Sequence, residues 1–329
     1  MKRREFITLL GGAVALPLVE ARAQQPTMPV IGYLSPRSSE ADAAMLTAIR
    51  QGLAETGYVD GRNVAIESRF SSGYDRWPAL FTELTRQQVA VIVATALPGP
   101  DPVVRLVQTS QIPIVFNAGL DPVRFGLVAS FNRPGGNVTG VYTLNSGTAG
   151  KQMSLLRELV SNATTFAALG GTPPGLTVSN EVQEELHKNA ASLGLQLRVL
   201  NANTEGEINA AFASLEQQRP DAFLVMSGPV MQVHAKLIAA LAARLAVPAM
   251  YPRREYAEAG GLMSYGYDIA DGYREMGRYA GRILKGEKPA NLPVFQPTRF
   301  QFIINLKTAR ALGLTIPPTL LAIADEVLE

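Results

Sequence analysis

Residues 112–144 read IPIVFNAGLDPVRFGLVASFNRPGGNVTGVYTL, and this stretch decides how the chain is organised. It begins with the apolar run Ile112–Phe116, which predicts a short buried strand. A turn at Asp121-Pro122 follows, and then the loop Asn132–Asn137, whose density of Pro and Gly excludes helix and sheet. The next strand, Val138–Leu144, starts directly after the loop. This order of strand, turn, stiff loop and exit strand is typical of a chain that leaves one α/β lobe, passes a cleft and begins another.

Apolar strands alternate with amphipathic helices before this stretch. The predicted strands are Val30–Ser35, Val64–Phe70 and Val89–Ala94. Each is followed by apolar residues at helical spacing, and the uniformly apolar third strand is typical of a parallel strand that is covered on both faces. Strands that alternate with helices predict a right-handed, doubly wound parallel sheet.

The second half of the chain repeats the same plan. We predict strands at Phe166–Leu169, Leu195–Leu200, Ala222–Met226 and Val247–Tyr251, with helices between them that include one long helix through Val233 and Leu241. A strand at Leu262–Tyr267, a helix at Ile269–Leu284, a strand at Phe300–Asn305 and a helix from Lys307 complete the chain. The fold class that we predict is α/β, with two doubly wound parallel-sheet lobes related by a pseudo-twofold axis. We expect the first lobe to hold residues 29–143 and 266–295, the second to hold 144–265 and 296–329, and three crossing segments to form a hinge.

The first 23 residues have the features of an export signal. Lys2-Arg3-Arg4 is a positive head, Phe6–Val19 is an uncharged apolar run, and Ala21-Arg22-Ala23 fits the small-x-small cleavage rule. The arginine pair is similar to that of twin-arginine signals. An uncleaved membrane anchor is the alternative, but the apolar run is shorter than the roughly 20 residues that a spanning helix needs. We therefore expect a periplasmic protein of 306 residues.

Composition excludes several classes of function. Without residues 1–23 the chain has 26 basic and 26 acidic residues, so nothing favours a nucleic-acid partner or a membrane surface. The absence of cysteine excludes disulfides, thiol catalysis, cysteine-ligated zinc and a lipid-modified N-terminal cysteine. The two histidines, His187 and His234, are both predicted to lie in the middle of helices and far apart. We expect no metal, no cofactor and no catalytic residue, since the chain also has neither G-x-S-x-G nor a phosphate-binding loop.

Several short motifs occur along the chain: Ile31–Ser35, Gly52-Leu53, Gly57-Tyr58, Asp60–Asn63, Ile112–Phe116, Asp121–Val123, Arg133–Gly140, Ile304–Ala309 and Leu312–Leu314. In these motifs the chain resembles a known family, the periplasmic substrate-binding proteins of ABC transporters, of the tryptophan/tyrosine-binding type and with the type I periplasmic-binding fold. The resemblance implies a monomeric receptor that binds a small molecule between its lobes and docks to an ABC permease in the inner membrane. Family members often carry an acidic residue after the second strand, where this chain has Ser71-Ser72-Gly73.

The candidate ligand-binding residues follow from the rule that open parallel sheets bind ligands beyond the carboxyl ends of their strands. They are Ser35, Ser71, Ser72, Thr95, Ala96, Asn117 and Asp121 in the first lobe, and Thr172, Ser227, Tyr251 and Tyr265 in the second lobe and hinge. Hydroxyls and helix N-terminal amides suit a carboxylate, and Asp121 suits an ammonium group. Each also has a structural interpretation, because Ser and Thr cap helices, Asp before Pro fixes turns and Tyr packs hinges.

Thr95 and Ser227 occupy equivalent places in the two halves, which predicts one hydroxyl on each wall of the cleft. The ligand that we expect is therefore a small, amino-acid-like carboxylate. Two other functions remain open: an exported ligand sensor that reports to a membrane receptor, and a periplasmic α/β enzyme, which the missing nucleophile and base disfavour.

Overall fold

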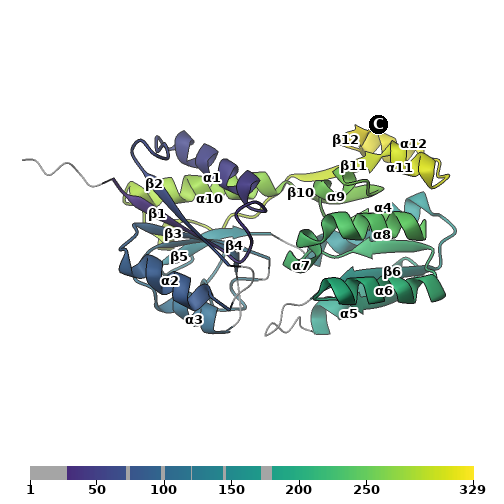
Figure 1. Ribbon diagram of the computed structural model, residues 1–329, viewed down its shortest axis with the longest axis horizontal. Helices are drawn as coiled ribbons and strands as arrows, with labels where there is room; N and C mark the ends of the chain where they lie inside the picture. The colour runs from purple at the N-terminus through teal and green to yellow at the C-terminus, as the bar shows by residue number, and fades with distance from the viewer. Residues whose placement is uncertain (1–27, 72–74, 98–100, 120, 144–145, 172–179) are drawn as a thin grey trace, which may run out of the picture.

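The computed structural model describes residues 28–71, 75–97, 101–119, 121–143, 146–171 and 180–329. Figure 1 shows two α/β bodies side by side, each built around its own sheet. The chain passes between the bodies three times. The first crossing lies between β5 and α4 and the second between β10 and α10. The third lies between Phe295, which pairs with β5, and β11.

The first body contains a five-stranded sheet of order β2-β1-β3-β4-β5, in which every neighbouring pair is parallel. Its strands are β1 (Val30–Ser35), β2 (Ala65–Phe70), β3 (Val91–Leu97), β4 (Ile114–Ala118) and β5 (Val138–Tyr142). Its helices are α1 (Ala43–Glu55), α2 (Trp77–Arg86), α3 (Asp101–Thr109) and α10 (Ile269–Leu284), followed by the short 3-10 helix η1 (Pro289–Asn291). One core lies between the sheet and α1 with α10, and another lies between the sheet and α2 with α3.

The second body contains a seven-stranded sheet of order β12-β11-β10-β9-β8-β6-β7. Its strands are β6 (Thr165–Gly170), β7 (Gln196–Asn201), β8 (Ala222–Val225), β9 (Ala249–Tyr251), β10 (Met263–Tyr267), β11 (Phe300–Asn305) and β12 (Glu326–Leu328). Its helices are α4 (Ser146–Leu159), α5 (Asn180–Ser192), α6 (Glu205–Gln217), α7 (Pro229–Val233), α8 (Ala235–Leu245), α9 (Arg254–Glu258), α11 (Leu306–Ala311) and α12 (Pro318–Ile323).

The predicted fold class is confirmed, with two differences in the second sheet. The pair β10–β11 is antiparallel. The chain leaves β10 for α10 in the first body, and β11 then runs back beside β10 in the opposite direction. The short strand β12, which pairs with β11 in parallel, was not expected, and neither was α12. The long helix predicted through Val233 and Leu241 is in fact two helices, α7 and α8, with His234 between them.

Helix α10 follows β10 directly but packs on the first body, along α1 (Figure 1). Glycines allow this close contact. A Cβ atom at Gly277 would lie 2.2 Å from the Ile49 carbonyl oxygen, and one at Gly52 would lie 1.8 Å from the Arg274 carbonyl oxygen. The two helix backbones are in direct contact. The chain that leaves β10 is therefore held on the first body by α10, the helix that follows β10.

The return crossing is fixed in a similar way. Phe295 exchanges backbone hydrogen bonds with β5, donating to Gly140 and accepting from Tyr142 at 2.9 Å each. The Thr139 hydroxyl donates to the Leu292 carbonyl at 2.7 Å. Residues 292–295 therefore belong to the edge of the first sheet, and the chain re-enters the second sheet at β11 five residues later.

Candidate ligand-binding site between the two sheets

The carboxyl edge of the first sheet carries a row of polar residues. Ser71 follows β2, Ser35 ends β1, Thr95 lies near the end of β3 and Asn117 lies near the end of β4. The register places them on neighbouring strands, since Ser35 pairs with Phe70, Leu34 with Ala94, and Ala94 with Phe116. All four side chains are buried. The strand-end rule thus brings Ser35, Ser71, Thr95 and Asn117 together, and we call them the polar row.

The polar row contains a bulge between β3 and β4, at the end of the row formed by Thr95 and Asn117. Ala94 pairs with Phe116 and Leu97 pairs with Ala118, so Thr95 and Ala96 on β3 share a place opposite Asn117 on β4. Bulges of this kind re-aim side chains, and they occur often beside functional sites. The Thr95 hydroxyl and the Asn117 amide nitrogen are both buried, and neither has a hydrogen-bond partner among the described residues. Buried polar atoms are rarely left unpaired, so within the row these two atoms are the candidates for contact with a ligand.

Ser35 and Ser71 are already engaged within the protein. The Ser35 hydroxyl accepts from the Arg37 backbone N–H at 3.2 Å. The Ser71 backbone N–H donates to the Ser35 carbonyl at 3.0 Å, and the Ser71 hydroxyl lies 3.5 Å from the same oxygen. These bonds shape the loops at the end of the row.

Arg37 lies two residues beyond the row and is buried, with 7% of its side chain exposed. Its Nε atom forms an ion pair with Asp42 at 2.5 Å, and its Nη2 donates to the Tyr273 hydroxyl at 2.7 Å. The Tyr33 hydroxyl donates to the other Asp42 oxygen at 2.7 Å. Burial alone would lower the pKa of Arg37, but Tyr273 and Asp42 raise it on balance, so the guanidinium stays charged.

Arg37 also reaches the second body. Its Nη1 donates to the side-chain oxygen of Gln232 on α7, at 3.1 Å. The α7 helix follows β8 and Ser227, so it stands at the carboxyl edge of the second sheet. Ser227 is partly exposed at this edge. The carboxyl edges of the two sheets therefore face the same space, as the prediction for Thr95 and Ser227 requires; their contact with a ligand stays a prediction.

A small pocket of about 220 Å³ lies near the crossing from β10 to α10. Ala44 and Met45 of α1 line it from the first body, and Arg253, Glu255, Tyr267 and Gln301 line it from the second. Arg253 is fixed by Glu255, whose two oxygens accept from its Nη2 at 2.8 Å and its Nε at 3.3 Å. Burial would raise the pKa of Glu255, but the charge and hydrogen bonds of Arg253 lower it on balance. None of the predicted site residues lines this pocket.

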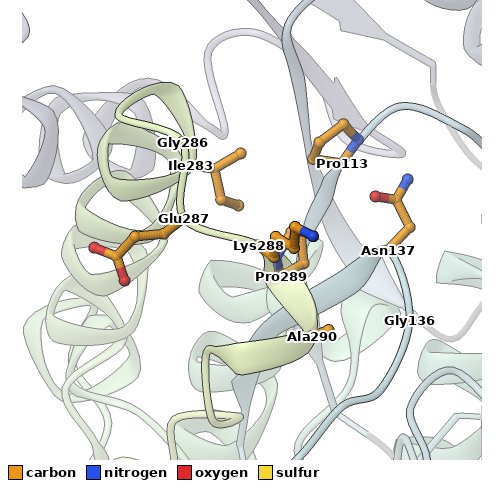
Figure 2. A pocket seen from close by; sticks show the side chains of 9 residues that line it. All are labelled: Pro113, Gly136, Asn137, Ile283, Gly286, Glu287, Lys288, Pro289 and Ala290. Atoms are coloured by element: carbon orange, nitrogen blue, oxygen red, sulfur yellow. The ribbon is translucent and has the colours of Figure 1, made fainter.

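A second, larger groove of about 440 Å³ lies at the opposite end of the first sheet (Figure 2). Pro113 and Asn137, which precede β4 and β5, form one side, and residues 283–290 at the end of α10 form the other. The amino ends of the strands therefore carry a groove, but it holds no candidate residue.

The remaining predicted residues have structural surroundings. Asp121 accepts from the backbone N–H groups of Val123 at 2.9 Å and Arg124 at 3.3 Å, so it fixes the turn. Tyr251 is 1% exposed and stacks on Tyr256 in a core of the second body, which leaves it no free face for a ligand. Tyr265 is partly exposed and stacks on Phe300, with ring centroids 5.7 Å apart. Ser72 and Thr172 lie outside the described residues, as does the side chain of Ala96.

His187 lies within α5 as predicted, whereas His234 lies at the junction of α7 and α8 and not in the middle of a helix. Among the described residues, no group of three or more His, Cys, Asp or Glu could hold a metal ion. Within the same ranges, no helix is both long and apolar enough to span a membrane.

The site residues predicted from the sequence did not include Arg37, Asp42, Tyr273 or Gln232. The strand-end rule could have selected Arg37, because it follows β1 by two residues. Nothing in the sequence indicates its partners, since Gln232 and Tyr273 lie 195 and 236 residues further along the chain.

Comparisons with known proteins agree with the overall fold. Residues 31–328 match the model of a family described as ABC transporter substrate binding protein. A tyrosine-binding protein of Clostridioides difficile (strain R20291) is 25% identical over 268 residues, which cover 80% of this chain and 75% of that protein.

Two solved structures are similar over most of the chain. An ABC domain from Streptococcus pneumonia in complex with L-Trp has a TM-score of 0.79 and 27% identity, over 91% of this chain and 99% of that one. A conserved domain protein from Vibrio cholerae has a TM-score of 0.80 and 24% identity over the same shares of the two chains.

Proposed function

Because this chain belongs to the family of ABC transporter substrate-binding proteins, we propose that it is an exported receptor for a small amino-acid ligand. In this proposal the ligand binds between the two sheets, the lobes close on it, and the closed receptor docks to an ABC permease in the inner membrane. The chain acts as a monomer, needs no cofactor and carries out no chemical step on its ligand.

One observation carries the proposal for the site: the unpaired Thr95 hydroxyl and Asn117 amide of the polar row. An unpaired buried polar group costs about 1–3 kcal/mol, and a bound ligand removes that cost by supplying the partner. A hydroxyl and an amide N–H can both donate to a carboxylate, which every free amino acid carries. Ser227 supplies a further hydroxyl from the other lobe.

An aromatic side chain on the ligand is supported by the relatives. The complex with L-Trp and the tyrosine-binding protein both point to a flat, aromatic amino acid. Tyr265 is the aromatic residue that we propose for contact with it, because its ring is partly exposed beside the crossing from β10. We leave Tyr251 out of the proposed pocket because it is buried in the core.

Closure of the lobes follows from the division of the site. The polar row belongs to the first body and Ser227 to the second, so each lobe offers only part of the contacts and a ligand favours the arrangement that brings them together. The three crossings act as the hinge. Small-angle scattering at saturating ligand should therefore show a smaller radius of gyration than scattering from the free protein.

A thermal-shift screen of the mature protein tests the proposal. L-Trp, L-Tyr and L-Phe are the principal probes, and indole and p-cresol are controls that keep the ring but lack the amino-acid group. A ligand at 100 times its dissociation constant stabilises the folded state by about 2.7 kcal/mol. We expect at least one amino acid to raise the melting temperature and both ring-only controls to leave it unchanged. A screen in which no amino acid or aromatic acid shifts the transition would contradict the proposed ligand class.

A further inference from the structure

Arg37 is held in one position by residues of the first body alone. Asp42 binds its Nε at 2.5 Å and Tyr273 binds its Nη2 at 2.7 Å, and Tyr33 in turn holds the second oxygen of Asp42. The guanidinium also lies over the Tyr273 ring, 5.8 Å from its centroid. Asp42 is fully buried and Tyr273 nearly so. Arg37 is therefore held rigidly to the segment after β1 and to α10, and this does not depend on the second body.

The Nη1 atom of this fixed guanidinium then contacts the second body through one residue, Gln232. The contact is a charge-assisted hydrogen bond of 3.1 Å in a part-buried place. Gln232 lies in the short helix α7, next to Val233, which is 64% exposed. The bond therefore connects the end of β1 in one body with the end of β8 in the other, across the proposed cleft.

We propose that Arg37 is a preorganised latch, and that its bond to Gln232 holds the two lobes together in the ligand-free protein. This proposal rests on the proposed receptor function, since it assumes that the lobes open and close. A ligand would then enter a receptor whose lobes already close part of the time. Because Arg37 is already fixed, the strength of the latch depends on the side chain at position 232.

The fixed position of Arg37 makes its bond to Gln232 stronger than a bond from a surface arginine. An arginine on a surface loses rotamer freedom when it forms a bond, and this loss offsets much of what the bond contributes. Arg37 has already lost that freedom through Asp42 and Tyr273, so only Gln232 is ordered when the lobes meet. Opening the lobes leaves Arg37 paired with Asp42, so the latch can be released without exposing an uncompensated charge in the first body.

Spin-label distances measure the latch directly, because the chain has no cysteine and two can be introduced without background. Gln51→Cys on α1 and Lys236→Cys on α8 are exposed positions in different bodies. In the ligand-free protein we expect a short-distance, closed population beside a longer one. A charge-assisted hydrogen bond corresponds to a factor of about ten to a hundred in an equilibrium constant. Gln232→Ala should therefore lower the ratio of closed to open protein by about tenfold or more.

Two further variants make the test specific. Gln232→Glu replaces the amide oxygen with a carboxylate facing Arg37, so we expect it to raise the closed population above that of the parent. Val233→Ala is the matched control, since it shortens a neighbouring exposed side chain on the same helix and should leave the distances unchanged.

The result that would overturn the latch is a parent protein with only the open population, or a Gln232→Ala distribution equal to that of the parent. A shift of the distances in Val233→Ala as large as that in Gln232→Ala would also overturn it, because the effect would then come from any change in α7 and not from the lost hydrogen bond. None of these three results depends on a ligand. The thermal-shift screen tests the receptor function separately, so the latch can fail while the receptor proposal stands.

Discussion

Thr95 lies opposite Asn117 at a bulge between β3 and β4, and each has a buried polar atom that no described residue satisfies. The two side chains form one end of the row, on β3 and β4, and the members at the other end, Ser35 and Ser71, are engaged by the protein itself. The unpaired positions are therefore confined to one point of the sheet edge. The proposed ligand contacts of the row therefore rest on Thr95 and Asn117.

Thr95→Val and Ser227→Ala should both weaken binding of the aromatic amino acid found in the screen. Thr95→Val keeps the shape of the side chain and removes only the hydroxyl. Hydrogen bonds to a charged group contribute about 1.5–3 kcal/mol, so calorimetry should show a dissociation constant raised roughly tenfold to a hundredfold by each change. Thr82→Val, on the exposed side of α2, is the control and should bind like the parent. Equal affinities for all four proteins would remove Thr95 and Ser227 from the site.

Gly277→Ala should destabilise the protein through the contact of α10 with α1. The added Cβ would lie 2.2 Å from the Ile49 carbonyl oxygen, which is backbone and cannot move alone. Overpacking of this kind costs about 1–3 kcal/mol, and urea unfolding should show that loss. Gly206→Ala in α6 is the matched control, because its nearest neighbouring atom is 4.0 Å away and Ala favours the helix. If Gly277→Ala unfolded at the same urea concentration as the parent, the close packing of the two helices would be wrong.

Asp221 should make stability depend on pH in the acid range. Its carboxylate accepts from the backbone N–H groups of Thr164 at 2.8 Å and Thr165 at 2.9 Å, and these bonds lower its pKa below the ordinary 3.8. A lowered folded-state pKa contributes stability above the unfolded pKa, and that contribution is lost as the pH falls through the folded value. Asp221→Asn should therefore be less stable than the parent at pH 7, and the difference should shrink toward pH 3.

Unfolding curves at several pH values, with the exposed Glu184→Gln on α5 as control, measure this effect. A difference between parent and Asp221→Asn that stays constant from pH 7 to pH 3 would show that the charge of Asp221 contributes nothing.

Arg37→Met should cost more than a surface change because it leaves Asp42 buried without its counter-charge. Removing one partner of a buried ion pair costs about 3–5 kcal/mol. Adding Asp42→Asn removes the uncompensated charge, so the double variant should recover part of the loss in a urea titration. If adding Asp42→Asn lowered the free energy of unfolding of Arg37→Met as much as it lowers that of the parent, the two side chains would not be coupled.

The exported protein should begin at Gln24. The motif Ala21-Arg22-Ala23 precedes it and fits a signal-peptidase site. N-terminal sequencing of protein from the periplasmic fraction should read Gln-Gln-Pro-Thr. An intact Met1 in the membrane fraction would instead indicate an uncleaved anchor.

Local sequence signals were enough to predict the plan of the fold. The strands Val30–Ser35 and Phe300–Asn305 and the helix Ile269–Leu284 were predicted with the bounds that the structure has. Local signals suffice here: uniform apolar runs for the strands, and for the helix an Asp268 cap and a terminating Lys-Gly-Glu-Lys-Pro. Strand β4 begins at Ile114 and not at Ile112, because an apolar run does not say where pairing with a neighbour starts.

The strand-end rule also determined part of the candidate site, since Ser35, Ser71, Thr95 and Asn117 lie in one row. It needs only the order of strands and the fact that parallel strands end at the same edge. The rule could not tell that Tyr251 turns into the core, because the direction of a side chain at a strand end depends on the helices that pack there.

The remaining features depend on contacts between segments that are far apart in the sequence. Strand β12 is three residues long and mostly exposed, and it exists because β11 offers a free edge. The bulge at Thr95 depends on how two strands align, and the Arg37–Gln232 bond depends on how two bodies meet across 195 residues of chain. Periodicity and caps act within a few residues, whereas these contacts are set by the register of whole sheets and by the close packing of α1 on α10.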